Sequence, residues 1–221
     1  MRNELSELAF ILDRSGSMAG LESDTIGGFN AFLEKQKALP GEARLTTVLF
    51  NHRDELLHDR LDIRGVGPLT AKEYSAGGST ALYDAVGHTI QKIENAQARA
   101  TEAYRAGRVL VVITTDGFEN ASRAYSAARV RAMIERQKEA GWEFLFLGAN
   151  IDAQEAAGHI GIAPDRAQEY CWDAEGTRLN FQAVSAAAAD FRATGALPGD
   201  WCGEIQADFA RRRGAKRNKD T

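Results

Sequence analysis

The chain has 221 residues, of which 44% are hydrophobic, and this is enough for one α/β domain with a sizeable core. The net charge of −4 and the pI near 5.7 do not point to a protein that binds polyanions through its overall charge. Cys171 and Cys202 lie far apart and outside any C-x-x-C motif, so the cysteines indicate neither a disulfide framework nor a zinc site.

The N-terminal residues are charged and lead directly into a strand pattern, without the apolar stretch of a signal peptide. No apolar run is long enough to cross a bilayer. We therefore expect a cytoplasmic protein that does not contact the membrane.

The first half of the chain alternates between strand and helix patterns. A continuous apolar run at 8–12 predicts a buried strand, and a helical pattern at about 22–38 ends at Leu39-Pro40-Gly41. Residues 45–50 predict a second strand. Residues 55–61 are polar and predict a short antiparallel edge strand, paired with the second across a four-residue turn.

The second half continues the same alternation. A loop at 62–79 precedes a helix with one apolar face, whose N-cap we expect to be Ser79 or Thr80. The remaining expected elements are a buried strand at 109–113, a helix near 121–140, a strand at 142–147, a short helix at 152–159, a weaker strand at about 167–172 and a helix at 176–193. This order predicts an α/β fold with a doubly wound, mostly parallel sheet of about six strands and helices on both faces.

The C-terminal part differs in charge from the rest. We expect residues 1–195 to form the domain and residues 196–221 to form an extension with a basic, flexible tail. Six of the chain's 27 basic residues lie within 211–221, so residues 1–210 carry a net charge of −9. The basic tail could contact a nucleic acid or an acidic partner, and it is the one route to nucleic-acid binding that the sequence offers.

The polar stretch after the first strand is the strongest indication of a functional site. Asp13, Ser15 and Ser17 are spaced two apart, so a tight loop bending at Gly16 can direct three side-chain oxygens into one concavity. One carboxylate and two hydroxyls suit a hard cation such as Mg²⁺, but they do not complete an octahedral shell.

Two further loops can supply the missing oxygens. Thr80 precedes a helix, and Asp116 follows the strand at 109–113. The strands that lead to Asp13 and Asp116 are expected to be neighbours at the topological switch point of the sheet, where their carboxyl ends converge. The sequence thus predicts one site with two carboxylates and three hydroxyls for a divalent cation.

These residues resemble a known pattern. Asp13-x-Ser15-x-Ser17, Thr80 within Gly-Gly-Ser-Thr-Ala-Leu-Tyr-Asp-Ala and Asp116 within Thr-Thr-Asp-Gly resemble the metal-ion-dependent adhesion site of von Willebrand factor type A (vWA) domains. The resemblance covers roughly residues 5–195 and all five motif positions, in a form similar to that of bacterial cytoplasmic members.

The resemblance implies a role for each residue. Ser15, Ser17 and Thr80 would bind the metal directly, and Asp13 and Asp116 would act mainly through water. Mg²⁺ is the expected ion, with Mn²⁺ or Ca²⁺ as substitutes. An ion held by few charged oxygens keeps most of its positive charge, so it attracts an Asp or Glu carboxylate of a protein partner. The chain would then be a protein-binding module and not an enzyme.

Other interpretations stay open. A Mg²⁺-dependent phosphatase could use Asp13 as nucleophile and Asp116 as metal ligand, although the residue two after Asp13 is a serine and no lysine lies near either loop. Serines in a loop and an aspartate before a glycine also occur in ordinary turns. We interpret Asp84 as structural, in the first turn of its helix, and we expect Arg14 and Met18 to line the site.

Overall fold

The computed structural model describes residues 2–217, with side chains described for residues 4–212, and contains one six-stranded sheet. The strand order is β3-β2-β1-β4-β5-β6. All neighbouring pairs are parallel except β2 and β3 at one edge, which are antiparallel. The doubly wound α/β fold predicted from the sequence is therefore confirmed. The strands are β1 (Arg2–Asp13), β2 (Ala43–Phe50), β3 (Asp54–Asp62), β4 (Ala106–Thr115), β5 (Trp142–Ala149) and β6 (Ala167–Tyr170).

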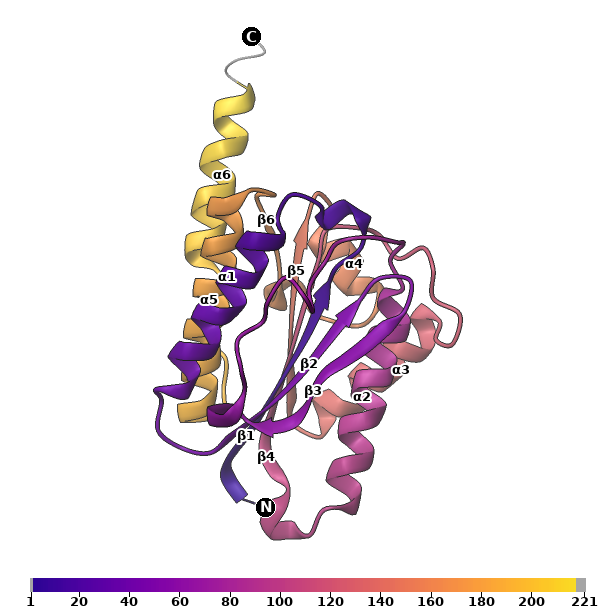
Figure 1. The fold of residues 1–221 in the computed structure, drawn as a ribbon, viewed down its shortest axis with the longest axis vertical. Coiled ribbons are helices and arrows are strands. Elements are labelled where there is room, and N and C mark those ends of the chain that lie inside the picture. The colour runs from indigo at the N-terminus through magenta and orange to yellow at the C-terminus, as the bar shows by residue number, and fades with distance from the viewer. Residues whose placement is uncertain (1, 218–221) are drawn as a thin grey trace.

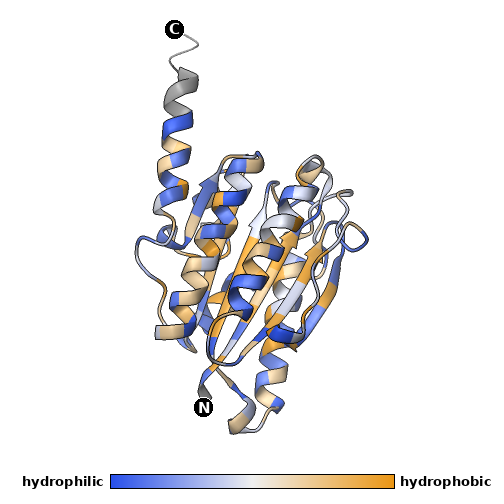
Figure 2. Cartoon of the chain, turned by 60° about the vertical axis from the view of Figure 1, so that its left-hand side comes forward, coloured by the Kyte–Doolittle hydropathy of each residue, from blue (hydrophilic) through white to orange (hydrophobic). Residues whose placement is uncertain are grey.

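Helices cover both faces of the sheet (Figure 1). The helices are α1 (Glu22–Lys37), α2 (Leu82–Arg99), α3 (Ala127–Glu139), α4 (Ala153–His159), α5 (Ala174–Thr194) and α6 (Gly203–Arg217). One core lies between the sheet and α1, α5 and α6, and the other between the sheet and α2, α3 and α4. Figure 2 shows the central strands as the most hydrophobic part of the chain, whereas the helices carry many hydrophilic residues.

Strand β1 lies at the centre of the molecule and is buried on both faces. Its side chains alternate, with Phe10 in the core under α1 and α5 and Ile11 in the core under α2 and α3. Both side chains are fully buried. A continuous apolar run is what such a strand requires, because neither face contacts water.

The carboxyl ends of the parallel strands lie together at one end of the sheet, which is at the top in Figure 1 and is called the upper edge below. Strand β1 is paired with both β2 and β4, so the chain leaves β1 at the switch point of the sheet. The register places Leu12 beside Thr114, one residue before Asp13 and two before Asp116. The loops predicted to converge therefore start next to one another.

The edge strand β3 contains a β-bulge that places one of its side chains against a buried carboxylate. The pairing of β2 with β3 shifts register between Leu45 and Val48, and Arg60 has a φ of +51°. This bulge turns Arg60 inward, where its Nε and Nη2 donate to the two carboxylate oxygens of Glu7 at 2.6 and 2.9 Å. Glu7 is fully buried, and burial raises the pKa of its carboxyl group.

Two helix starts differ from the sequence prediction. Helix α2 begins at Leu82 with Ala81 as N-cap, so the expected capping by Ser79 or Thr80 is wrong. The first N–H groups of α2 donate instead to another loop: Tyr83 N to Glu119 Oε2 at 2.9 Å, and Asp84 N to Ser122 Oγ at 3.0 Å.

The second difference concerns α3, which begins at Ala127 and not near 121. Residues 121–126 stay in a loop because the Asp84 carboxylate accepts backbone N–H groups from Arg123, Ala124 and Tyr125 at 2.8–2.9 Å. Asp84 is thus structural, as predicted. Ser126 then caps α3 by accepting from Arg129 N.

The chain after α5 packs against the body. Helix α5 ends at Gly195, whose φ of +82° is the left-handed conformation that favours glycine at this position. Leu197, Trp201 and Ile205 then join the core under α1 and α5. The domain boundary at 195 stays a prediction. The basic side chains of residues 213–221, and the course of residues 218–221, lie outside the part of the chain that the structure describes. Among the described residues, no helix combines the length and apolarity that a membrane span requires.

Candidate metal centre

The first loop directs its side chains toward the upper edge of the sheet by bonding to itself. Asp13 Oδ1 accepts the backbone N–H of Ser15 at 2.6 Å, which folds the chain back directly after β1. A single 3₁₀ turn at Gly16–Met18 follows, and the hydroxyls of Ser15 and Ser17 lie 3.0 Å apart. Asp13 and Ser15 are buried, whereas Ser17 is exposed. The exposed hydroxyl is therefore the part of this loop that a second molecule meets first.

The end of β4 meets this loop through two side chains. Thr115 Oγ1 donates to Asp13 Oδ2 at 2.6 Å, and Ser17 Oγ donates to Asp116 Oδ1 at 2.5 Å. The predicted meeting of Asp13, Ser15 and Ser17 with Asp116 is thus present, although the residues are about a hundred positions apart in the sequence.

Thr80 reaches the same place from the third loop. Its hydroxyl and that of Ser17 lie 3.3 and 3.4 Å from the position that a Cβ on Gly117 would occupy. Backbone contacts hold the loop in place: Gly16 N donates to Gly78 O at 2.9 Å, and Gly77 N donates to Arg14 O at 2.9 Å. Because capping falls to other residues, the Thr80 hydroxyl is not used by α2. All five predicted site residues are therefore brought together.

Burial changes the acidity of both carboxyl groups. It raises the pKa of Asp13 to about 6, against 3.8 for an ordinary aspartate, in spite of the hydrogen bonds from Thr115 and Ser15. It also raises the pKa of Asp116, which is opposed by hydrogen bonds from Ser17 and Trp172. Among the described residues, the contacts of these two carboxyl groups include no cationic side chain. A bound cation would therefore stabilise their charged forms, which burial disfavours.

The donor set fits a hard divalent ion. It offers three hydroxyl and two carboxylate groups, and oxygen is the ligand type that Mg²⁺ requires. The described residues contain no cluster of three or more His, Cys, Asp or Glu side chains suited to a metal. The oxygens that meet here come mainly from hydroxyl groups instead.

Three residues that the sequence did not single out also contact the site. Trp172 Nε1 donates to Asp116 Oδ2 at 3.0 Å, and the Tyr74 hydroxyl donates to the backbone carbonyl of Asp13. Thr115 is the third, through Asp13. Trp172 follows β6 at the same edge of the sheet, so its place after a parallel strand was the available signal.

The two residues expected to line the site are both buried. The guanidinium of Arg14 faces β3 and the loop at 62–79, where it donates to Glu55 Oε2 at 2.6 Å and to Glu73 O at 3.0 Å. Met18 is the last residue of the 3₁₀ turn in the first loop, and its side chain is buried. The charge of Arg14 is thus paired with Glu55, and Met18 carries none.

No protein-family model matches the sequence, and no curated protein matches it either. Solved structures do match. The vWA protein from Catenulispora acidiphila is 14% identical, with a TM-score of 0.52, over 85% of this chain and 43% of that chain. The vWA-type domain of the pilus tip protein Mfa5 from Porphyromonas gingivalis is 10% identical, with a TM-score of 0.54, over 82% of this chain and 95% of that one. The chain has a vWA fold.

A third match bears on the metal. Proximal thread matrix protein 1 from the mussel byssus was solved with zinc in its MIDAS motif, the metal-ion-dependent adhesion site. It is 16% identical, with a TM-score of 0.56, over 83% of this chain. The match covers 46% of that protein, so the chain spans about half the length of the first solved structures that it matches. At such low identity these likenesses establish the vWA fold alone.

Proposed function

We propose that this vWA-fold chain is a metal-dependent protein-binding module. Asp13, Ser15, Ser17, Thr80 and Asp116 would hold one Mg²⁺, with Mn²⁺ or Ca²⁺ as substitutes, and the ion would capture an Asp or Glu side chain of a protein partner. The observation that carries this proposal is the continuous set of contacts from Asp13 through Ser15 and Ser17 to Asp116, which joins the ends of β1 and β4.

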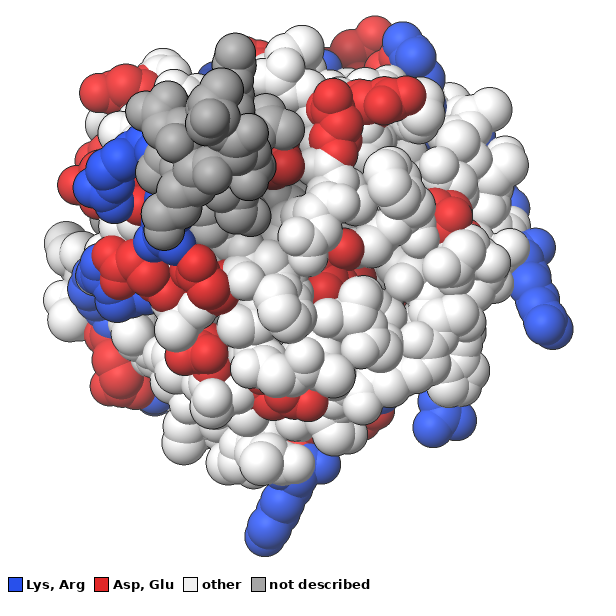
Figure 3. All heavy atoms as spheres, turned by 90° about the horizontal axis from the view of Figure 1, so that it is seen from above, with Lys and Arg blue, Asp and Glu red and all other residues white. Residues whose placement is uncertain are grey.

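The residues that hold the metal would determine how strongly it attracts a carboxylate. When bound, the metal supplies a positive charge that attracts a carboxylate. Ser15, Ser17 and Thr80 contribute neutral oxygens, so they neutralise little of this charge. Asp13 stays turned into the loop and toward Thr115. Figure 3, which looks onto this edge, shows acidic atoms in the middle of the face and Lys and Arg atoms mostly toward its outline. Without the ion, this face would repel an acidic partner.

The position of Asp13 favours binding over hydrolysis. A nucleophilic carboxylate needs an oxygen that faces the substrate. Asp13 is 1% exposed, and each of its two oxygens already accepts a hydrogen bond, one from Ser15 N and one from Thr115 Oγ1. The mussel byssus protein holds zinc in its MIDAS motif, which supports a divalent metal at the corresponding place here.

Calorimetry with Mg²⁺ tests the metal site. We expect wild type to bind one ion, and Asp13→Ala and the double variant Ser15→Ala/Ser17→Ala to lose binding. Ser79→Ala is the matched control, because Ser79 is exposed and lies beside Thr80 without joining the donor set. Equal binding by wild type and Asp13→Ala, with both folded by circular dichroism, would reject the assignment.

Capture of a carboxylate is tested with a defined probe. The peptide acetyl-Gly-Asp-Gly-amide should bind wild type in Mg²⁺ and should be released by EDTA, whereas acetyl-Gly-Asn-Gly-amide should not bind. A phosphatase assay with Mg²⁺ addresses the enzyme alternative. Turnover that is abolished by Asp13→Asn would overturn the binding proposal.

Two further expectations belong to this proposal. A cytoplasmic location stays a prediction from the sequence. Binding of nucleic acid through the basic residues of 211–221 also stays a prediction, and a salt-dependent shift with RNA or DNA that disappears when these residues are deleted would support it.

A further inference from the structure

A hollow of about 460 Å³ lies beside the candidate metal centre, between the end of β6 and helix α6. Trp172 and Phe209 contribute aromatic rings to its lining, and Cys171, Asp173 and Arg212 line it as well. None of its lining residues belongs to the predicted metal-ligand set. It is therefore a separate feature of the same edge.

Trp172 joins the hollow to the metal centre. Its indole N–H donates to Asp116 Oδ2 at 3.0 Å, and the far corner of the indole ring lies 4.0 Å from where a Cβ on Gly20 would be. The same side chain lines the hollow and is 37% exposed. Trp172 alone thus separates the hollow from Asp116, and a molecule in the hollow would lie near a carboxylate on the ion.

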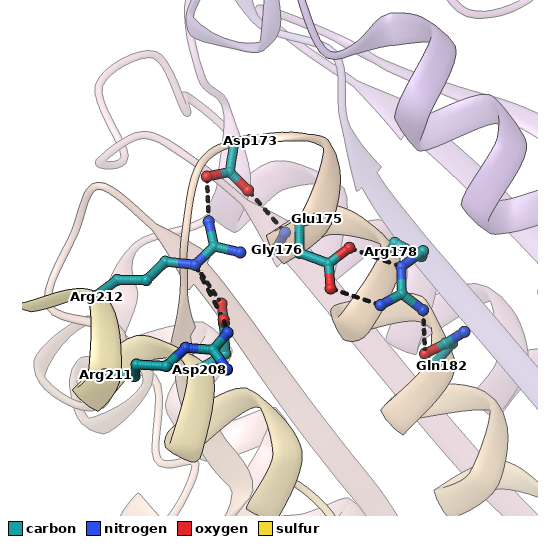
Figure 4. A network of polar contacts seen from close by, with 8 residues as sticks. All are labelled: Asp173, Glu175, Gly176, Arg178, Gln182, Asp208, Arg211 and Arg212. Atoms are coloured by element: carbon teal, nitrogen blue, oxygen red, sulfur yellow. Dashed lines mark hydrogen bonds and ion pairs between the residues drawn. The ribbon is translucent and has the colours of Figure 1, made fainter.

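The charged groups of the hollow already have partners (Figure 4). Arg212 from α6 forms ion pairs with Asp173 and with the buried Asp208. Asp173 also caps α5 by accepting the N–H of Gly176 at 2.8 Å, and Arg211 pairs with Asp208. Because Asp173 and Arg212 are paired within the protein, a ligand is left with the other lining groups, to which Trp172 and Phe209 contribute aromatic rings.

We propose that the hollow binds a large aromatic side chain next to the acidic residue that the metal captures, both on one partner segment. The inference rests on the proposed function, and it deepens it by defining the partner as an Asp or Glu adjacent to an aromatic residue. The indole of Trp172 and the ring of Phe209 supply faces for ring packing, and the planar guanidinium of Arg212 is a surface on which a ring can stack.

A charged occupant fits less well. A second carboxylate would compete with Asp173 and Asp208 for Arg212, and these two acids already neutralise it. A basic side chain would meet Arg212, which carries the same sign of charge, in the same hollow. An aromatic side chain avoids both conflicts, because it brings no charge.

Peptide affinities test the proposal. In Mg²⁺ we expect acetyl-Gly-Asp-Phe-amide or acetyl-Phe-Asp-Gly-amide to bind roughly tenfold tighter than acetyl-Gly-Asp-Gly-amide, which is the gain from burying most of a phenyl ring. The variant Phe209→Ala should remove that gain and leave the affinity for the glycine peptide unchanged. Equal affinities of the aromatic and glycine peptides, or tighter binding of a peptide with lysine in the aromatic position, would overturn it.

A second readout does not depend on Phe209. Cys171 lines the hollow and is half-buried, whereas Cys202 is buried and burial raises the pKa of its thiol. N-ethylmaleimide should therefore modify Cys171 first, with Cys171→Ser confirming the assignment by mass spectrometry. The aromatic peptide in Mg²⁺ should slow this modification more than the glycine peptide does at equal saturation, and equal protection by both peptides would contradict an occupied hollow.

These outcomes separate the two proposals. If the glycine peptide binds in a Mg²⁺-dependent way but the aromatic residue adds nothing, the hollow is not a subsite and the metal-dependent module stands. If neither peptide binds and Mg²⁺ itself does not bind, the proposed function fails, and the subsite fails with it.

Discussion

Two neutral hydrogen-bond donors hold the Asp116 carboxylate, and they set its orientation toward a bound ion. Ser17 donates to one of its oxygens and Trp172 to the other. Such hydrogen bonds fix the direction of a carboxylate and partly spread its charge. Asp116 follows β4, and one of its two donors is thus a tryptophan that follows the edge strand β6, two strands away in the sheet.

Replacing Trp172 with phenylalanine tests this positioning role. The ring stays, but the N–H donor is lost, so Asp116 gains freedom that metal binding must then remove. We expect a several-fold weaker affinity for Mg²⁺, in line with the roughly 0.5–1.5 kcal/mol of one hydrogen bond. Calorimetry measures it, and Trp142→Phe is the control, because Trp142 lies at the opposite end of β5. An unchanged affinity would show that Trp172 does not position Asp116.

The raised pKa of Asp13 predicts a dependence of stability on pH. Because the folded-state pKa is about 6 and the ordinary value is 3.8, the folded state holds the proton more tightly than the unfolded state. The contribution of Asp13 to stability is thus fully present below pH 3.8 and is lost as pH rises through about 6.

Asp13→Asn isolates this effect, since asparagine does not titrate. In EDTA, the unfolding free energy of the variant minus that of wild type should increase by roughly 2 kcal/mol between pH 4.5 and 7.5. Urea unfolding at the two values measures it. At pH 7.5, Mg²⁺ should stabilise wild type and not the variant. Parallel pH profiles of the two proteins would contradict the prediction.

At the scale of elements, α1 and α5 pack closely because α1 has a glycine where they meet. A Cβ on Gly28 would lie 2.2 Å from Cδ2 of Phe181, so no larger residue fits without displacing the ring. Gly27 is the next residue on the same helix, and nothing lies within 4 Å of its Cβ position. The close contact holds α5, the helix that begins directly after Trp172 and Asp173.

These two glycines make a matched pair of variants. Gly28→Ala should destabilise the protein by about 1–3 kcal/mol, because the added methyl group overpacks the contact with Phe181. Gly27→Ala should raise the unfolding free energy by about 0.5–1 kcal/mol, because alanine favours a helix and meets open space. Chemical unfolding of both variants measures the difference, and equal effects would mean that α1 and α5 are not in close contact.

At the scale of the whole molecule, the part after α5 belongs to the core. Trp201 and Ile205 are 6% and 2% exposed, and Trp201 Nε1 donates to Asp165 O at 2.8 Å. A chain that ends at Gly195 would lose these contacts and expose apolar surface of α5 and β6. We expect a melting temperature lower by several degrees or more, with a tendency to self-associate.

Thermal unfolding and size-exclusion chromatography test this truncation. A chain that ends at Arg217 is the control, since it keeps α6 and lacks only the last four residues. If the chain ending at Gly195 is as stable and monodisperse as the control, the predicted domain boundary at 195 is supported.

The sequence predicts the parts of this molecule that follow from strand order. The convergence of Asp13, Ser15, Ser17 and Asp116 could be predicted, because parallel neighbours place their carboxyl ends at one edge. The role of Trp172 was missed, because the weak pattern extended the predicted strand to about residue 172, whereas β6 ends at Tyr170 and leaves Trp172 in the loop that follows. The caps of α2 were also missed, since Glu119 and Ser122 come from positions 36 and 38 residues away.

The two edge strands of the sheet, β3 and β6, restrict how this protein can bind other proteins. At one side, β3 is bulged at Arg60, and this strand carries charged residues along its length. At the other, β6 pairs with β5 over four residues only and has α6 packed against it. Recruitment of a foreign strand by backbone pairing, and the fibrillar association that can follow from it, are therefore both disfavoured. Recognition is left to side chains at the carboxyl ends of the strands.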